Sequence, residues 1–199
     1  MPALFGSIQL RDLTLGNRII VSPMCQYSAD QGAASSWHAM HLGTLALSGA
    51  GCLIVEATGV APEGRITHGC LGLWDDAQEQ ALGETLKAVR AWSGMPIGIQ
   101  LGHAGRKASA GRPWEGGAPL EQKDGAWRCI APSAAPFDDG WPAPEALDTA
   151  GMKRIIADFV QAVERAVQLG FDLVEIHAAH GYLLSQFLSP LANKRNDEY

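Results

Sequence analysis

Two histidines and a tyrosine lie close together after an apolar run near the carboxyl end of the chain. His177, His180 and Tyr182 belong to the segment Glu175-Ile-His-Ala-Ala-His-Gly-Tyr182. Because the two histidines are three residues apart, a helical turn would place both rings on one side. Neutral imidazoles can donate N–H bonds to one substrate oxygen, and a nearby phenol can deliver a proton. This combination suits the reduction of an activated double bond.

Two other interpretations of this segment stay open. A histidine packed in the core together with one that caps a helix would explain the same residues without chemistry. Histidine pairs also bind zinc, but no third ligand stands at a suitable spacing nearby. A metal-dependent hydrolase that uses His177, His180 and Cys25 is therefore the least favoured hypothesis.

A thiol and a phenol follow an earlier apolar run, in the segment Ser22-Pro-Met-Cys-Gln-Tyr27. A thiol in such a place can be a nucleophile, a metal ligand or a group that tunes a bound redox ring, although an isolated cysteine is more often buried and inert. Among the other cysteines, Cys52 is expected in the core, whereas Cys70 and Cys129 fall in loops without an assigned role.

A third polar cluster is Gln100-Leu-Gly-His-Ala-Gly-Arg-Lys107. The Gln100 amide can both donate to and accept from a planar heterocycle. Arg106 and Lys107 could attract a phosphate-bearing ligand or form a solvated basic pair, and the pattern favours neither. Further along, three tryptophans could wall a pocket or anchor a loop, namely Trp114, Trp127 and Trp141.

Short apolar strands and helices must position these groups. Four apolar runs predict buried parallel strands, and capping residues with apolar positions at helical spacing predict three helices between them. The strands are expected at Ile19–Met24, Cys52–Ala57, Pro96–Leu101 and Phe171–Ile176, and the helices at Ser36–Ser48, from Asp75 or Asp76 to Trp92, and from Asp148 or Thr149 to Val167.

The alternation of strands and helices predicts an α/β fold with a parallel sheet. A doubly wound sheet would place a glycine-rich phosphate turn after its first strand, but Ser22-Pro-Met-Cys has none. The polar clusters all follow carboxyl ends of strands, where a (β/α)₈ (TIM) barrel keeps its active site. A barrel typically has about 250 residues, so we expect about the first four βα units, with residues 102–147 as a long loop that caps the site.

Composition excludes several other classes. The 199 residues are 47% hydrophobic and 18% charged, with a formal net charge of −6 and no block of like charge, which argues against binding to nucleic acid or an anionic membrane. No apolar stretch reaches the roughly 18 residues of a membrane helix. No cysteine pair or signal peptide is evident, so we expect a soluble, reduced, cytoplasmic protein.

Several motifs, in order along nearly the whole chain, resemble those of the old yellow enzyme family of FMN-dependent ene-reductases, and within it the thermophilic-like branch typified by xenobiotic reductase A. The motifs are Asn17-Arg-Ile, Ser22-Pro-Met-Cys-Gln-Tyr27, Val55-Glu-Ala-Thr58, Ala61-Pro-Glu-Gly-Arg-Ile66, Gln100-x-x-His-Ala-Gly-Arg-Lys-Ala108, Arg112-Pro-Trp-Glu115, Ile130-Ala-Pro-Ser133, Glu175-Ile-His-x-Ala-His-Gly-Tyr182 and Asn193-Lys-Arg195.

The resemblance implies a TIM barrel that carries FMN at its carboxyl face. It implies that Tyr182 donates a proton, that His177 and His180 hold a substrate carbonyl and that Tyr27 lines the substrate pocket. No metal is implied. The residues expected to bind the flavin are Ser22, Pro23, Met24, Cys25, Ala57 and Gln100, with Cys25 modulating its potential.

The implied reaction passes hydride from NADPH or NADH through flavin N5 to the β carbon of an α,β-unsaturated carbonyl or nitro compound. The alternative is a noncatalytic truncated half-barrel, because residues 1–199 resemble only the amino-terminal half of the family's single barrel and lack its phosphate-binding loops. A half-barrel exposes two strand edges, so we expect a homo-oligomer or pairing with a complementing half-barrel.

Overall fold

A four-stranded parallel sheet forms the centre of the protein. The structure, a computed structural model, describes residues 2–199. The sheet has the order β3-β4-β5-β8. Neighbouring strands of this sheet therefore follow one another in the sequence, as in a barrel. Its strands are β3 (Ile20–Val21), β4 (Cys52–Gly59), β5 (Ile97–Gly102) and β8 (Leu173–Ile176).

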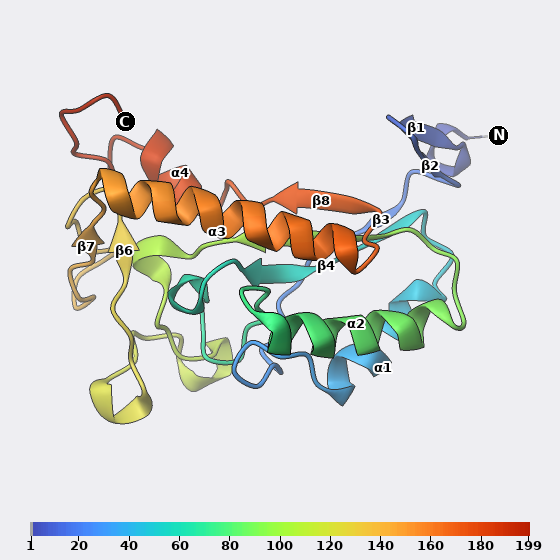
Figure 1. Ribbon diagram of the computed structural model, residues 1–199, viewed down its shortest axis with the longest axis horizontal. Coiled ribbons are helices and arrows are strands. Elements are labelled where there is room, and N and C mark those ends of the chain that lie inside the picture. Colours follow the sequence, from blue (N-terminus) through green and yellow to red (C-terminus); the bar gives the residue numbers. More distant parts are fainter. Residues whose placement is uncertain (1) are drawn as a thin grey trace.

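Three long helices connect these strands, as the sequence predicts. They are α1 (Ser36–Ala46), α2 (Asp76–Arg90) and α3 (Thr149–Gln168), and all lie along the sheet in Figure 1. The Asp75 and Asp148 side chains cap α2 and α3 by accepting N–H bonds from Ala77 and Gly151. The apolar stripe expected to run to Trp92 stops earlier, since α2 ends at Arg90 and Trp92 is exposed.

Successive side chains of each strand point to opposite faces of the sheet, so the two faces carry different sets of residues. Leu53, Val55, Ile97, Ile99 and Leu101 pack in one core cluster with apolar side chains of α2 and α3. The intervening positions of β4 and β5 point to the opposite face, because successive strand residues alternate. Gln100 and Glu175, paired in register on β5 and β8, lie on this second face, which is the interior side of a barrel.

An amino-terminal hairpin covers the start of the sheet and was not predicted. Its strands β1 (Ile8–Leu10) and β2 (Leu13–Leu15) are antiparallel. Leu15 is buried against Cys52 and Ile54, which places Cys52 in a core as expected. Figure 1 shows the hairpin at the right-hand end, where the strands begin, opposite the end that carries the polar clusters.

The first predicted strand is wrong in its length. The expected Ile19–Met24 contains only the two-residue β3, which pairs with Cys52 and Leu53. Pro23 has no N–H to donate to a ladder, so pairing stops before it. β4 instead continues past Ala57 to Gly59, β5 is displaced by one residue from Pro96–Leu101, and β8 starts at Leu173 instead of Phe171.

The segment between β5 and α3 has little regular structure. It contains a short parallel pair, β6 (Ile130–Ala131) and β7 (Glu145–Ala146), which lies at the left of Figure 1 beside the carboxyl ends of the strands. A short helix α4 (Leu183–Leu188) follows β8. The chain also forms single 3₁₀ turns at Ala3–Phe5, Pro62–Gly64, Gly105–Lys107, Pro113–Glu115 and Gln122–Asp124.

Several apolar side chains on the outer helices are exposed. On α3 these are Ile156, Val160 and Val167, although the sequence pattern groups them with the buried Ile155 in one stripe. On and just after α1 they are Trp37, Met40 and Leu47. Within residues 2–199, no helix is both long and apolar enough to cross a membrane.

Candidate functional site at the carboxyl edge of the sheet

The two histidines and the tyrosine that follow β8 lie together. The ring centroids of His177 and Tyr182 are 4.9 Å apart, and those of His177 and His180 are 5.0 Å apart. The turn that would place both rings on one side if it were helical is not helical, because His180 adopts a positive φ of 55° and Gly181 one of 69°. This left-handed turn, and not helical spacing, turns the His180 ring back onto His177.

Hydrogen bonds define the proton positions on the histidine pair. Ala179 N–H donates to His177 Nδ1 at 3.3 Å, so a neutral His177 carries its proton on Nε2. That Nε2 lies 3.3 Å from His180 Nδ1. Burial, and secondarily the neighbouring His180, lowers the pKa of His177, which favours its neutral form. A neutral ring that presents an N–H is the form that can donate to a carbonyl oxygen.

The phenol of Tyr182 is kept protonated. Burial is the main cause that raises its pKa above the ordinary value, and Cys25, Tyr27 and Cys70 add to it. Lys107 lies over the Tyr182 ring, 5.2 Å from its centroid, and donates to the main-chain oxygen of His180 at 3.0 Å. This lysine therefore secures the turn between the histidines and the tyrosine.

A second part of the site comes from the segment that follows β3. The main chain of Tyr27 has a positive φ of 54°, a strained conformation for a tyrosine. Arg112 Nε donates to Tyr27 O at 3.1 Å, and the Trp114 ring packs edge-on against Tyr27 with centroids 5.6 Å apart. Burial raises the pKa of Tyr27 to about 12. The motif Arg112-Pro-Trp-Glu115 thus anchors Tyr27, the residue expected to line the substrate pocket.

Cys70, which the sequence left unassigned, contacts the predicted flavin residue Cys25. The neighbouring Cys70 thiol is the main cause that raises the pKa of Cys25, and burial and the nearby Glu56 add to it. Cys70 is buried and lies 3.4 Å from both the N and Oγ1 atoms of Thr67. It also lines a small cavity of about 10 Å³ together with His177 and Tyr182. Only the folded loop brings Cys70 here, so no sequence signal identified it.

The middle of the edge is formed by β5 and β8. Gln100 donates to Glu175 Oε1 at 2.5 Å, which leaves its amide oxygen to accept. A Cβ at Gly102 would lie 3.2 Å from His177 Cβ, so this glycine makes room for the histidine on the adjacent strand. The main chain of Ala57 on β4 partly offsets the raised pKa of the Cys25 thiol.

The remaining predicted candidates have mixed placements. Met24 is exposed, and Ser22 and Met24 line a small cavity beside α1. Arg106 donates to the carbonyl oxygens of Ala135 and Pro136 at 3.3 Å and 2.9 Å, so it secures the long loop. Of the other two tryptophans, Trp127 donates to Glu63 O at 3.0 Å, whereas Trp141 packs against Phe137.

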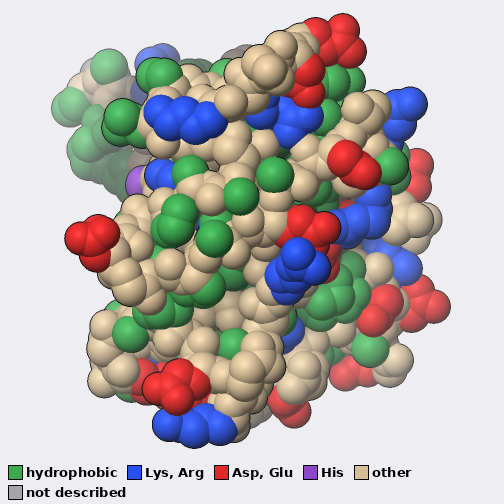
Figure 2. All heavy atoms as spheres, turned by 90° about the vertical axis from the view of Figure 1, so that its left-hand side faces the viewer, with side chains coloured by type: hydrophobic (Ala, Val, Ile, Leu, Met, Phe, Trp, Pro, Cys, Tyr) green, Lys and Arg blue, Asp and Glu red, His purple; other side chains and the backbone are tan. Residues whose placement is uncertain are grey.

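The groups at this edge suit an uncharged planar ring. The thiol of Cys25, the amide of Gln100 and the neutral His177 offer hydrogen bonds without a net charge. Figure 2, which views the left-hand side of Figure 1, shows Lys or Arg side chains mixed with Asp and Glu ones. Among residues 2–199, no three His, Cys, Asp or Glu side chains lie together so as to hold a metal ion.

Comparison with known proteins shows which family the chain belongs to. A family model described as the NADH:flavin oxidoreductase / NADH oxidase family matches residues 3–199. The chain belongs to this family. Membership implies FMN as the cofactor and a nicotinamide nucleotide as the hydride donor, and the chemistry of the donor set above agrees with the flavin ring.

Members and solved structures of the flavin oxidoreductase family resemble the chain over its whole length. It is 45% identical to an NADPH dehydrogenase of Geobacillus thermodenitrificans, over 98% of the chain and 54% of that protein. Morphinone reductase in complex with tetrahydroNAD superposes with a TM-score of 0.81 at 32% identity, over 100% of this chain and 55% of the other. An old yellow enzyme from Pichia superposes with a TM-score of 0.85 at 29% identity, over 99% and 51%.

These comparisons confirm the predicted family and its TIM-barrel fold. The four-stranded parallel sheet corresponds to part of that barrel. The chain spans about half the length of the relatives that it matches.

Proposed function

We propose that this chain carries the substrate half of an FMN-dependent ene-reductase site. The observation that carries the proposal is the cluster of His177, His180 and Tyr182 beside Cys25 and Gln100, at the carboxyl edge of a parallel sheet. Support also comes from the relatives, since one is named an NADPH dehydrogenase and another is solved with tetrahydroNAD.

In this proposal the residues of the chain divide the work between holding and protonating the substrate. Cys25, Ala57 and Gln100, with the main chain of residues 22–24, would hold the ring of FMN. When bound, FMN supplies the hydride that it receives from NADPH or NADH and that adds to the β carbon of an α,β-unsaturated carbonyl or nitro compound. His177 and His180 donate N–H bonds to the substrate oxygen, where negative charge grows.

Tyr182 completes the reduction by transferring its phenolic proton to the α carbon, and water then returns a proton to the phenolate. The net change adds one hydride and one proton across the C=C bond. Tyr27 lines the side of the pocket, where Arg112 and Trp114 hold it. The positions of these groups supply orientation and charge stabilisation.

An isotope experiment tests this function. The protein with added FMN is given cyclohexenone and NADPH that carries deuterium at the transferable C4 position. The proposal expects cyclohexanone with deuterium at the β carbon and solvent hydrogen at the α carbon. If the enone remains unchanged at saturating FMN, the chain is instead the noncatalytic half-barrel.

The apolar outer surfaces support a proposal about assembly. Ile156, Val160 and Val167 lie exposed on α3, the helix that precedes the edge strand β8, and Trp37 and Met40 lie exposed on α1, the helix that follows the opposite edge strand β3. Such surfaces are costly in water. We propose that further βα units cover them, supplied by a longer parent chain, by a second copy of this chain or by a complementing half-barrel.

A further inference from the structure

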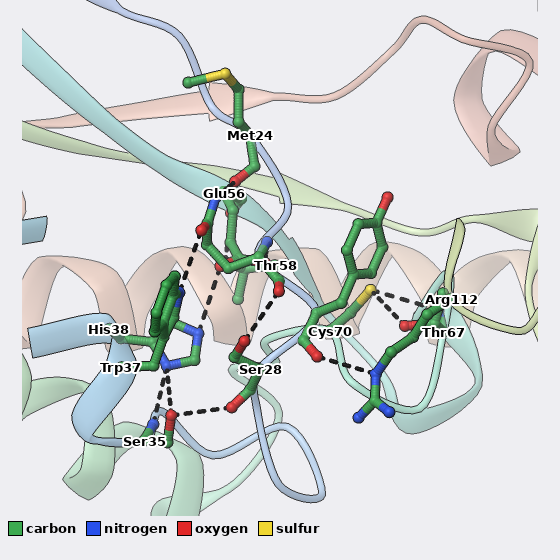
Figure 3. Close-up of polar contacts among 12 residues, drawn as sticks. Met24, Ser28, Ser35, Trp37, His38, Glu56, Thr58, Thr67, Cys70 and Arg112 are labelled. Carbon is green, nitrogen blue, oxygen red and sulfur yellow. Dashed lines mark hydrogen bonds and ion pairs between the residues drawn. The ribbon is translucent and has the colours of Figure 1, made fainter. Parts of the chain in front are cut away.

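One buried carboxylate lies behind the segment that carries Cys25 and Tyr27. Glu56, on β4, is 4% exposed, and its Oε2 accepts the main-chain N–H of Gln26 at 2.9 Å. Gln26 is the residue between the thiol and the phenol. This hydrogen bond therefore helps to fix the main chain from which both candidate side chains project. Figure 3 shows Glu56 close to this segment, near Met24.

The carboxylate of Glu56 is itself in contact with α1. His38 is 1% exposed, and its Nε2 lies 3.4 Å from Glu56 Oε1, close but not aligned as a hydrogen bond. Ser35 N–H donates to His38 Nδ1 at 2.9 Å, so a neutral ring carries its proton on Nε2, toward the carboxylate. His38 is the third residue of α1 and caps the start of the helix with Ser35.

The segment around Gln26 depends on such contacts because it has left the sheet. Strand pairing of this part ends at Val21. Beyond Val21, Trp37 Nε1 donates to Gln26 Oε1 at 3.2 Å, and Gln26 Nε2 donates to Met24 O at 2.8 Å. Figure 3 shows these bonds running from the first turn of α1 toward Met24. Tyr27 keeps its strained positive φ only if its neighbours hold it.

Burial of a carboxylate carries a desolvation penalty in free energy, which an apolar residue in the same space would not have. Glu56 instead directs one oxygen to a main-chain N–H and the other to His38. Its charge also contributes, after larger causes, to the raised pKa values of Cys25 and Tyr27. The side chain thus combines a positional and an electrostatic effect on the same two residues.

We propose that Glu56 is a positioning residue, whose carboxylate fixes Cys25 and Tyr27 at the carboxyl edge through the Gln26 N–H. The importance of these two residues rests on the proposed function, but their placement by Glu56 does not. It can be tested on the protein without flavin or substrate, so its failure and a failure of ene-reductase activity are distinguishable.

The test is the rate at which iodoacetamide alkylates Cys25, measured by peptide mass spectrometry across a pH series. Cys25 is half-buried, whereas the other three cysteines are buried. The variants are Glu56→Gln and Glu56→Ala. The matched control is Gln78→Ala, because Gln78 is 5% exposed and likewise binds main-chain atoms of this loop, donating from α2 to Gln31 O at 3.0 Å, four residues beyond Tyr27.

The titratable groups that face Cys25 are Cys70, Glu56, Tyr27 and Tyr182, so the pH series is needed to isolate the contribution of Glu56. Glu56→Gln keeps an acceptor for the Gln26 N–H but removes the charge. We expect the curve of its alkylation rate against pH to move to lower pH by up to about one pH unit. At a fixed pH this corresponds to an alkylation rate up to about tenfold higher. Glu56→Ala also releases the segment, so its alkylation is faster still.

The control should label at the wild-type rate. Wild-type labelling in a folded Glu56→Ala protein, or equally fast labelling in Gln78→Ala, would overturn the proposal. If Glu56→Ala does not fold, Glu56→Met decides in its place, because it removes the acceptor for the Gln26 N–H but keeps the volume of the side chain; wild-type labelling in that variant also overturns the proposal.

Discussion

The chemistry at the scale of single residues depends on keeping two buried groups neutral. Burial lowers the pKa of His177 and raises that of Tyr182, so the imidazole stays a neutral donor and the phenol keeps its proton. The proposed mechanism requires both forms. Each role can be removed separately by substitution.

We expect Tyr182→Phe to lower enone reduction by about 10²-fold or more, because general acids contribute on that scale. His177→Ala should weaken substrate binding as well as turnover, since it removes a donor to the oxygen. Steady-state kinetics with cyclohexenone measure both effects. NADPH oxidation by bound FMN needs neither group and is the internal control. Undiminished enone turnover in both variants would contradict the assigned roles.

A buried histidine predicts how stability depends on pH. Burial lowers the pKa of His103 to about 4, against an ordinary value near 6.5. Between these values the unfolded chain binds the extra proton, so stability falls as pH falls from about 6.5 to about 4. Urea unfolding at pH 7 and pH 5 should show a loss on the order of 1–2 kcal/mol that His103→Gln lacks. An equal loss in both proteins would contradict this assignment.

The sequence predicts the residues of the site better than their geometry. The His-x-x-His-x-Tyr spacing identified three residues that do meet, but the turn that joins them could not be predicted because the positive φ of His180 is not encoded by residue type. Cys70 and Glu56 were missed as site neighbours, since only the packing of loops and strands brings them to Cys25.

At the scale of elements, strand pairing determines where the side chains stand. Periodicity located β4, β5, β8 and the three long helices, because their buried faces have a regular spacing. The β1–β2 hairpin was missed because each of its strands has three residues, too short for a period to show. β3 was overextended because Pro23 ends its pairing.

Two glycines on β5 offer a matched pair of substitutions. A Cβ at Gly102 would lie 3.2 Å from His177 Cβ, whereas one at Gly98 would crowd Leu173, at 2.9 Å from its Cδ2 and 3.2 Å from its main-chain oxygen, and would not touch a site residue. We expect Gly102→Ala to displace His177 and lower enone turnover roughly tenfold. Gly98→Ala should leave turnover nearly unchanged and affect only thermal stability. Equal effects on turnover would show that the positioning argument is wrong.

For the whole molecule, the sheet has two edge strands and apolar outer surfaces. β3 and β8 form the edges, with exposed apolar side chains on the adjacent α1 and α3. We expect light scattering to find an oligomer at micromolar concentration, and Ile156→Lys with Val160→Lys to shift it toward monomer. The control is the double variant Gln80→Ala with Lys87→Ala, because both of these residues are exposed on α2. A monomeric wild type would contradict assembly through these surfaces.

The central claim is that this carboxyl edge holds FMN. The most direct measurement adds FMN to the purified 199-residue protein, separates the mixture by gel filtration and records flavin absorbance across the protein peak. The account predicts that flavin elutes with the protein and that its visible spectrum differs from that of FMN in solution. Protein that elutes without flavin, at a volume that shows it to be folded and not aggregated, would contradict it.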